Sequence, residues 1–410
     1  DAMLKELDPY TTYIPEEDEE DFKFMITGEY AGVGATIGKV KDTISFMEVY
    51  YGTPSYKNGI KAGDQIIEIE GKKTEDITVN DVSENLRGEQ GTQVKVTVKN
   101  PITGKIKKHS ITREKISLPT IEYADTLENG IGYIRFSSFT EKSASLFKKA
   151  FLHLKEDKKI NSLIIDLRNN PGGLLDQATE IVNMFIENQS TIVYTKGKVK
   201  QLDEVYKATR HPIDTRIPIV VLVNKNSASA SEIFSGAMQD LDRAVIIGER
   251  TFGKGLVQST RTLPFGGNLK VTISKYYIPS GRCVQAINYS EKDEEGNASR
   301  IADSLTSEFK TKNGRIVRDG GGITPDITIK KKNISTIAYY LYTENIIFNY
   351  AVQYVAKHPK METPKSFVFK EYDDFIAYAK KQKFSYKLKT EEVLNSLKEI
   401  AEKEGYLEHS

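Results

Sequence analysis

Cysteine and long apolar runs are scarce in this chain of 410 residues. The single cysteine, Cys283, excludes an internal disulfide and says little about the compartment. No apolar run approaches the ~18 residues that span a bilayer. No cysteine–histidine cluster has the spacing of metal ligands. We therefore expect no membrane-spanning helix, no metal and no cofactor.

An excess of one charge sign is also missing. The formal net charge is +1, so nothing favours nucleic acid or an anionic membrane as a partner. A hydrophobic content of 39% suffices for packed cores, and the length suggests roughly two to four domains. No signal peptide opens the chain at Asp1, so we expect a targeting segment to be absent from it.

Residues 224–258 organise the chain. The preceding apolar run, Ile217 to Val223, predicts a buried strand. After a group of small residues, helical spacing of apolar side chains predicts a helix that begins near Ser229. The unit is a strand, a tight turn and a helix. A serine hydroxyl can be exposed at such a turn, and amides at a helix N-terminus can hold an anion.

A serine nucleophile needs a base, and histidine, the usual one, is absent from this stretch. The histidines lie elsewhere, at His109, His153, His211, His358 and His409. Lys254, between two glycines, is the better candidate, provided that burial lowers its pKa enough to make it neutral. If residues 254–259 are extended, Gln258 projects on the same side and can hold the amine without adding charge.

These residues also have structural interpretations. Serines at a helix start are commonly caps, and a lysine between glycines is commonly a solvated turn. The catalytic alternative is a Ser–Lys pair with a supporting Gln258, a known variant of the serine–base arrangement.

The whole block resembles the active site of the carboxy-terminal processing peptidases, or tail-specific proteases. The resemblance rests on Ser-Ala-Ser-Ala-Ser-Glu, Ala-Met-Gln-Asp and Ile-Gly-Glu-Arg-Thr-Phe-Gly-Lys-Gly, in that order. It implies Ser229 as nucleophile, Lys254 as general base and Gln258 as the supporting glutamine. Lys225-Asn226, where the family often carries a glycine, is a minor departure.

Residues 28–115 resemble a PDZ domain, most specifically in Gly63-Asp64-Gln65-Ile66-Ile67. A PDZ domain adds an extended peptide as a strand and captures its terminal carboxylate with backbone amides. The resemblance places that capture at Gly32, Val33, Gly34 and Ala35, which alone would be an ordinary turn. Arg87 ends the helix expected over Val79 to Arg87. It is either a solvated charge that suits the helix dipole or a contact that couples this domain to the core.

Residues 116–330 alternate strands and helices, which indicates an α/β core. The expected strands include Gly132–Phe136 and Leu163–Leu167, and the expected helices Ser143–Leu154 and Leu174–Ile186. By resemblance to a ClpP/crotonase-like protease core, the oxyanion hole takes one amide from Ala230 and one from Gly172 or Gly173. The alternative is that both glycines merely permit the turn.

The remaining segments carry weaker signals. Tyr276 and Tyr277 either line a substrate groove or are half-buried strand aromatics. Residues 289–320 are polar and predict a long surface loop with limited order. Residues 1–27 are acidic, mostly helical in pattern, and predict an arm packed on the core. The segment 331–410 predicts a helical extension with helices over Ile334–Lys357, Phe375–Lys381 and Glu391–Glu404.

The expected fold is a multidomain α+β and α/β chain with a PDZ domain, a protease core and a helical C-terminal extension. The resemblance implies a serine endopeptidase that cleaves proteins near apolar C-termini, in the periplasm or cell envelope. The apolar face of the C-terminal helices, expected against the core or another subunit, suggests a homo-oligomer. Two alternatives are a catalytically silent PDZ scaffold, against which Ser229, Lys254 and Gln258 argue, and a crotonase-type acyl-CoA enzyme.

Overall fold

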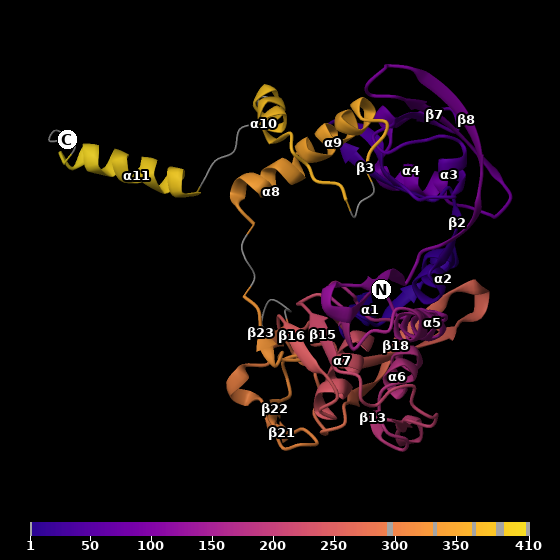
Figure 1. The fold of residues 1–410 in the computed structure, drawn as a ribbon, viewed down its shortest axis with the longest axis vertical. Coiled ribbons are helices and arrows are strands. Elements are labelled where there is room, and N and C mark those ends of the chain that lie inside the picture. Colours follow the sequence, from indigo (N-terminus) through magenta and orange to yellow (C-terminus); the bar gives the residue numbers. More distant parts are fainter. Residues whose placement is uncertain (1, 293–297, 331–333, 363–365, 383–388, 407–410) are drawn as a thin grey trace. The chain divides into compact units, whose positions relative to one another are not determined.

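The computed structural model describes residues 2–292, 298–330, 334–362, 366–382 and 389–406 (Figure 1). The chain forms two compact units, residues 1–30 with 117–331 and residues 31–116 with 332–410. It passes between the units in the paired strands β2 (Glu29–Gly32) and β9 (Glu114–Ser117). In the described part of the chain, no helix combines the length and apolar character that crossing a bilayer requires.

A sheet of six strands runs through the first unit in the order β10-β11-β12-β15-β16-β23. All its pairs are parallel except β10 with β11. Its strands are β10 (Ile121–Thr126), β11 (Ile131–Phe136), β12 (Ser162–Asp166), β15 (Ile219–Val223), β16 (Val245–Gly248) and β23 (Ile327–Thr328). The strands predicted over Gly132–Phe136 and Leu163–Leu167 are confirmed to within a residue at each end.

Helices follow three of these strands: α5 (Ser143–Leu152), α6 (Leu175–Asn183) and α7 (Ala230–Asp240). Every residue of α7 is buried, as expected for a helix surrounded by protein. Its small residues permit close packing, because a Cβ added to Gly236 would lie 2.7 Å from Ile278 Cδ1. Packing around α7 therefore fixes the turn that begins it.

A second, antiparallel sheet of the first unit is built on the long strand β18 (Asn268–Tyr277). One edge of β18 pairs with β17 (Leu256–Thr262). The other edge pairs with β1 (Thr12–Ile14) and then with β13 (Thr191–Gly197), which continues to β14 (Glu204–Lys207). The arm, with helices α1 (Ala2–Lys5) and α2 (Glu19–Thr27), thus adds a strand to this sheet.

The prediction of a long surface loop over residues 289–320 is wrong for the described residues. They contain the pairs β19 (Ile287–Lys292) with β20 (Ala298–Arg300) and β21 (Glu308–Lys310) with β22 (Ile316–Arg318). Some of the charged side chains form ion pairs while staying partly exposed, as Arg318 does with Glu308. Arg315 binds Asp242 at 2.6 Å and also binds Asp326. These contacts hold the segment against the unit.

The second unit contains a sheet in the order β3-β4-β5-β7-β8, with β6 (Lys72–Lys73) beside β5. Its strands are β3 (Ala35–Val40), β4 (Thr43–Val49), β5 (Gln65–Ile69), β7 (Gln93–Lys99) and β8 (Ile106–Thr112). Its helices are α3 (Pro54–Lys57) and α4 (Val79–Leu86), the latter begun by a capping box of Thr78 and Asp81. Phe46, Ile66 and Val82 are fully buried in its core.

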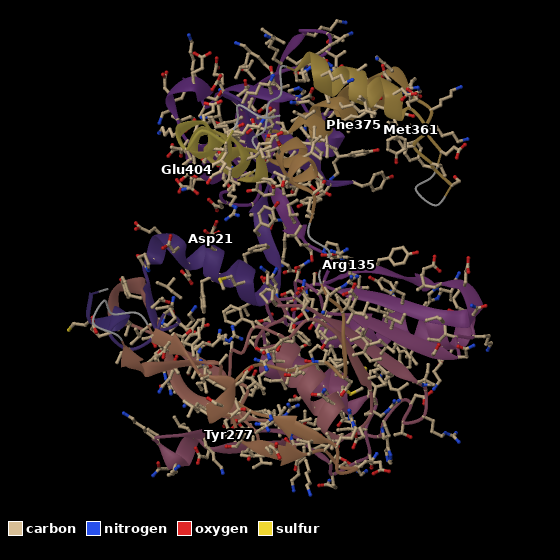
Figure 2. All side chains as sticks on the ribbon, turned by 90° about the vertical axis from the view of Figure 1, so that its left-hand side faces the viewer. Asp21, Arg135, Tyr277, Met361, Phe375 and Glu404 are labelled. Carbon is tan, nitrogen blue, oxygen red and sulfur yellow. The ribbon has the colours of Figure 1, made fainter. Side chains whose placement is uncertain are left out.

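The C-terminal helices of the second unit are α8 (Thr336–Thr343), α9 (Ile346–Lys357), α10 (Tyr372–Lys381) and α11 (Lys389–Lys403). The single helix predicted over Ile334–Lys357 is wrong, because the left-handed Asn345 (φ 55°) separates α8 from α9. Helix α9 packs within its own unit. A Cβ added to Gly63 would lie 2.6 Å from Val352. Tyr350 contacts Phe375 of α10 at 5.1 Å between ring centroids. Figure 2 labels Phe375.

Candidate active site

The turn before α7 holds Ser229 in a backbone conformation that L-residues rarely adopt, with φ 54° and ψ −116°. Such a conformation is costly and persists where the surrounding structure enforces it. A strained serine between a strand and a buried helix is the geometry of a nucleophile elbow. The turn therefore has the form that presents a reactive hydroxyl.

The three serines of this turn differ in their surroundings. Ser227 and Ser231 are fully buried, and their hydroxyls donate to Leu167 O at 2.7 Å and Asn170 O at 3.0 Å. Ser229 is only partly buried. The hydroxyls of Ser227 and Ser231 are committed to holding the turn, which leaves Ser229 as the candidate nucleophile.

Glu232 ties Ser229 to the loop that carries Lys254. Its Oε2 accepts from Ser229 N at 3.0 Å and from Lys254 N at 2.8 Å. Its Oε1 accepts from Thr251 Oγ1 at 2.6 Å and from Gly253 N at 2.8 Å. Burial raises the pKa of Glu232 to about 7, against the effect of these donated hydrogen bonds. Sequence reasoning missed this residue, although Ser-x-x-Glu is the spacing of a capping box.

The Tyr276 hydroxyl contacts the backbone carbonyls of the same two residues, Ser229 and Lys254. Its hydroxyl donates to Lys254 O at 2.7 Å and lies 3.3 Å from Ser229 O. The side chain is fully buried, so it is not the half-buried aromatic or groove residue that the sequence suggested. Burial raises its pKa well above the ordinary value of a phenol, which keeps it a donor. Glu232 and Tyr276 thus bracket Ser229 and Lys254 from both sides of the backbone.

The amine of Lys254 lies in a partly buried position that suits a neutral base. Burial, and next the nearby charge of Lys270, lower its pKa to about 8 against the opposing charges of Asp8 and Glu232. Within the described residues, Nζ has no ion pair. Its nearest recorded contact is the ring of Tyr10, 4.2 Å from Nζ to the centroid.

Gln258 lies at the start of β17, where a register shift between Val257 and Gln258 interrupts the regular alternation. Its Nε2 donates to Thr272 Oγ1 at 3.3 Å, and Thr272 Oγ1 donates to Asp8 Oδ1 at 3.1 Å. In the described part of the chain it makes no recorded hydrogen bond with Lys254. Its support of the amine therefore stays a prediction.

Gly172 and Gly173 both have positive φ, 104° and 134°. A Cβ added to Gly172 would lie 2.8 Å from Ala230 N and 2.6 Å from Ala228 O, so only glycine fits beside the Ser229 turn. Gly172 N donates to Asn170 Oδ1 at 2.9 Å. Among the described residues, Gly173 N and Ala230 N donate no hydrogen bond. Ala230 directly follows Ser229, and Gly173 directly follows Gly172, whose added Cβ would lie 2.8 Å from Ser229 Cβ.

The second candidate site, Gly32 to Ala35, leads from β2 into β3. The carbonyls of Val33 and Gly34 accept from Ser55 N at 2.9 Å and Tyr50 N at 3.1 Å. The amides of Val33 and Gly34 donate no hydrogen bond within the described residues, and β3 is an end strand of its sheet there. Arg87 follows α4 directly, with its backbone N–H on Ser83 O. Its coupling role stays a prediction.

Three family models match the chain. They are described as "Peptidase family S41" (residues 130–294), "PDZ domain" (residues 46–100) and "Probable PDZ-protease, C-terminal helical domain" (residues 337–410). The predicted fold class, a PDZ domain with a protease core and a helical C-terminal extension, is thereby confirmed.

Curated relatives agree with these models. A carboxyl-terminal-processing protease of Picosynechococcus is 40% identical over 278 residues, 66% of this chain and 66% of that protein. A carboxy-terminal-processing protease of Bartonella bacilliformis is 37% identical over 290 residues, 70% of this chain and 66% of that protein. The matched part of the chain therefore spans just under two thirds of their length.

Solved structures include a photosystem II D1 C-terminal processing protease, 26% identical, with a TM-score of 0.44 and 80% of each chain covered. The family models and the curated relatives identify the chain as a member of the carboxyl-terminal processing proteases, the PDZ-containing serine proteases of peptidase family S41.

Proposed function

We propose that this protein is a serine endopeptidase that cleaves protein substrates near their C-termini, with Ser229 as nucleophile and Lys254 as base. One observation carries the proposal. The strained Ser229 and the partly buried Lys254 are held together by Glu232 on their amide side and by Tyr276 on their carbonyl side. A nucleophile and a base need such mutual positioning to act as a pair.

In acylation, the neutral Lys254 amine takes the proton of Ser229 as the hydroxyl oxygen attacks the scissile carbonyl carbon. The resulting ammonium then gives that proton to the leaving amine as the peptide C–N bond breaks. Water hydrolyses the acyl-enzyme with Lys254 again as base. A lysine with a pKa of about 8 is suited to both directions of this transfer.

We assign the oxyanion hole to the amides of Ala230 and Gly173. An oxyanion needs donors that are not already engaged. Gly172 N is occupied by Asn170 Oδ1, whereas Gly173 N and Ala230 N donate to no group among the described residues. In this proposal Gly172 serves by being small, since a side chain there would strike the nucleophile turn. Gln258, held by Thr272, orients the lysine amine.

The PDZ domain is proposed to receive the substrate tail. The unengaged amides of Val33 and Gly34 suit a terminal carboxylate, and the edge of β3 suits an added strand. Apolar tails are the substrates we infer from the resemblance. Arg87, at the end of α4, is the proposed link between an occupied PDZ domain and the core.

The resemblance also underlies a proposal about where the protein resides. We propose a periplasmic or cell-envelope location, which recovery of the native protein in the cytosolic fraction would contradict.

We further propose assembly through the C-terminal helices, where α11 exposes Leu394, Leu397 and Ile400. The molar mass in solution gives the number of subunits. If a chain truncated near Lys330 keeps the same number of subunits, that assembly mode is excluded.

Tyr276→Phe tests the positioning of the pair. The substitution removes the side-chain donor of Lys254 O, which costs about 1–3 kcal/mol, whereas Ser229 O keeps the backbone donors Glu232 N and Ile233 N. We expect kcat to fall about tenfold with KM unchanged. Tyr277→Phe is the matched control, because the Tyr277 ring stacks on Tyr194 and its hydroxyl has no recorded hydrogen bond in the described structure. Equal kcat values for the two variants would refute the positioning role.

The function itself is tested with an unstructured protein that ends in apolar residues, supplied as the free acid and as the C-terminal amide. Mass spectrometry locates the cleavage site. We expect cleavage near the C-terminus and a higher kcat/KM for the free acid, because only it offers a carboxylate to the PDZ amides. Cleavage of neither substrate would contradict the peptidase. Equal cleavage of both would contradict only the role of the carboxylate loop.

A further inference from the structure

A tyrosine from the N-terminal arm lies on the catalytic lysine. The ring centroid of Tyr10 is 4.2 Å from Lys254 Nζ, within the range of a cation–π contact. The sequence suggested only that the arm packs on the core. In the structure, the arm brings an aromatic face to the one side-chain nitrogen that the proposed reaction uses.

Several hydrogen bonds hold Tyr10 in place. Asp8 Oδ1 accepts from Tyr10 N at 2.8 Å, from Thr11 N at 3.0 Å and from Thr272 Oγ1 at 3.1 Å. Thr272 N donates to Thr11 Oγ1 at 3.1 Å, next to the pairing of β1 with β18. The rings of Tyr289 and Tyr10 form a T-shaped pair, 6.0 Å between centroids. A side chain fixed by its neighbours in this way is preorganised.

The charged groups around Lys254 are Lys270 on β18, Asp8 on the arm and Glu232 on α7. Asp8 is engaged by the arm and Thr272, and Glu232 by backbone amides and Thr251. The phenols of Tyr10, Tyr276 and Tyr289 complete the surroundings. No carboxylate is paired with Nζ in the described structure, so the aromatic face of Tyr10 is its direct partner.

We propose that Tyr10 is a catalytic residue whose ring stabilises the ammonium that Lys254 becomes when it accepts the Ser229 proton. The inference rests on the proposed function. The proton leaves Ser229 Oγ for the Nζ lone pair, and the oxygen's electron pair forms the bond to the substrate carbonyl carbon. Positive charge therefore develops on Nζ, beneath the negative face of the ring.

An aromatic face suits this task better than a carboxylate. A buried carboxylate next to Nζ would favour the ammonium strongly and leave the resting lysine charged. The attraction of a neutral ring is weaker, and the ring also excludes water, which favours the neutral amine. The lysine can thus rest neutral at mildly alkaline pH and still have its transient cation stabilised.

The test compares Tyr10→Phe with Tyr10→Leu in the full chain, with the neighbouring Tyr13→Leu as control. Lys254 is titrated by carbon NMR of its ε-methylene, and kcat is measured on the alkaline plateau. The Phe variant keeps an aromatic face and should resemble the wild type. The Leu variant keeps burial but loses that face, so the pKa of Lys254 should fall below its wild-type value. We expect its plateau kcat to fall about tenfold.

Unchanged pKa and plateau kcat in Tyr10→Leu would overturn the inference. If that variant does not fold, fluorinated phenylalanines at position 10 replace it, because they weaken the ring face and keep its shape. A stepwise fall in kcat and in the Lys254 pKa with fluorination would support the inference, and a flat series would overturn it. A wild-type protein that cleaves nothing would refute the proposed function, while the NMR titration would still report on the Tyr10–Lys254 contact.

Discussion

Replacing Ser229 with alanine should abolish peptide cleavage, with a loss in kcat of about 10³- to 10⁶-fold. The hydroxyl is the proposed nucleophile, and the buried hydroxyls of Ser227 and Ser231 are engaged with backbone carbonyls. Fragment analysis of an unstructured substrate gives the measurement. Cleavage that survives in Ser229→Ala and disappears in Ser227→Ala or Ser231→Ala would move the nucleophile to one of those residues.

Ser229→Gly separates chemistry from folding. At φ 54° glycine relieves a backbone strain that serine and alanine share, which amounts to about 1–2 kcal/mol. We therefore expect both variants to be inactive and only the glycine variant to be more stable. Hydrogen exchange of the α7 amides reports that stability. An alanine variant as stable as the glycine variant would contradict the strained elbow.

Replacing Lys254 with methionine should lower kcat by about 10³-fold or more, because the variant lacks the amine proposed to accept the Ser229 proton. Lys254→Arg should be as inactive, since a guanidinium is not deprotonated in a protein. Steady-state kinetics with a peptide substrate gives both values. An arginine variant close to wild type would show that Lys254 acts as a charge and not as a base.

The pKa of Lys254 predicts the pH dependence of the wild-type enzyme. Only the neutral amine acts as base, and its pKa lies at about 8. The value of kcat/KM should therefore rise about tenfold per pH unit below pH 8 and level off above it. The residual activity of Lys254→Met should not show this rise of kcat/KM below pH 8, the acidic limb of the profile. A limb that persists in the variant would belong to another group, and Glu232, with a pKa of about 7, would be the first to test.

The local part of this site could be predicted from the sequence. The apolar run before Ser229, the small residues and the helical spacing after it define the turn without tertiary information. Lys254 was a candidate from its place between two glycines and from the absence of a histidine in this stretch, whereas the roles of Gly172 and Gly173 followed from the resemblance. Glu232 also carried a local signal, the Ser-x-x-Glu spacing, and attention to that spacing would have found it.

The rest depends on contacts between distant segments. Tyr10 meets Lys254 only because β1 pairs with β18, a register that the short arm sequence does not encode by itself. Residues 289–320 looked solvated because their charges are mixed, and the acidic partners of Arg315 lie in other segments. The break at Asn345 interrupts an apolar pattern that runs through it, so helical periodicity alone missed it.

Covalent labelling with a fluorophosphonate tests the Ser229–Lys254 pair most directly, because the reagent reacts with an activated serine without any choice of peptide substrate. Mass spectrometry of the digested adduct identifies the modified residue. We predict a single adduct on Ser229, a labelling rate that rises with pH up to about 8, and no adduct in Lys254→Met. An adduct on another serine, or equal labelling of the Lys254→Met variant, would contradict the pair.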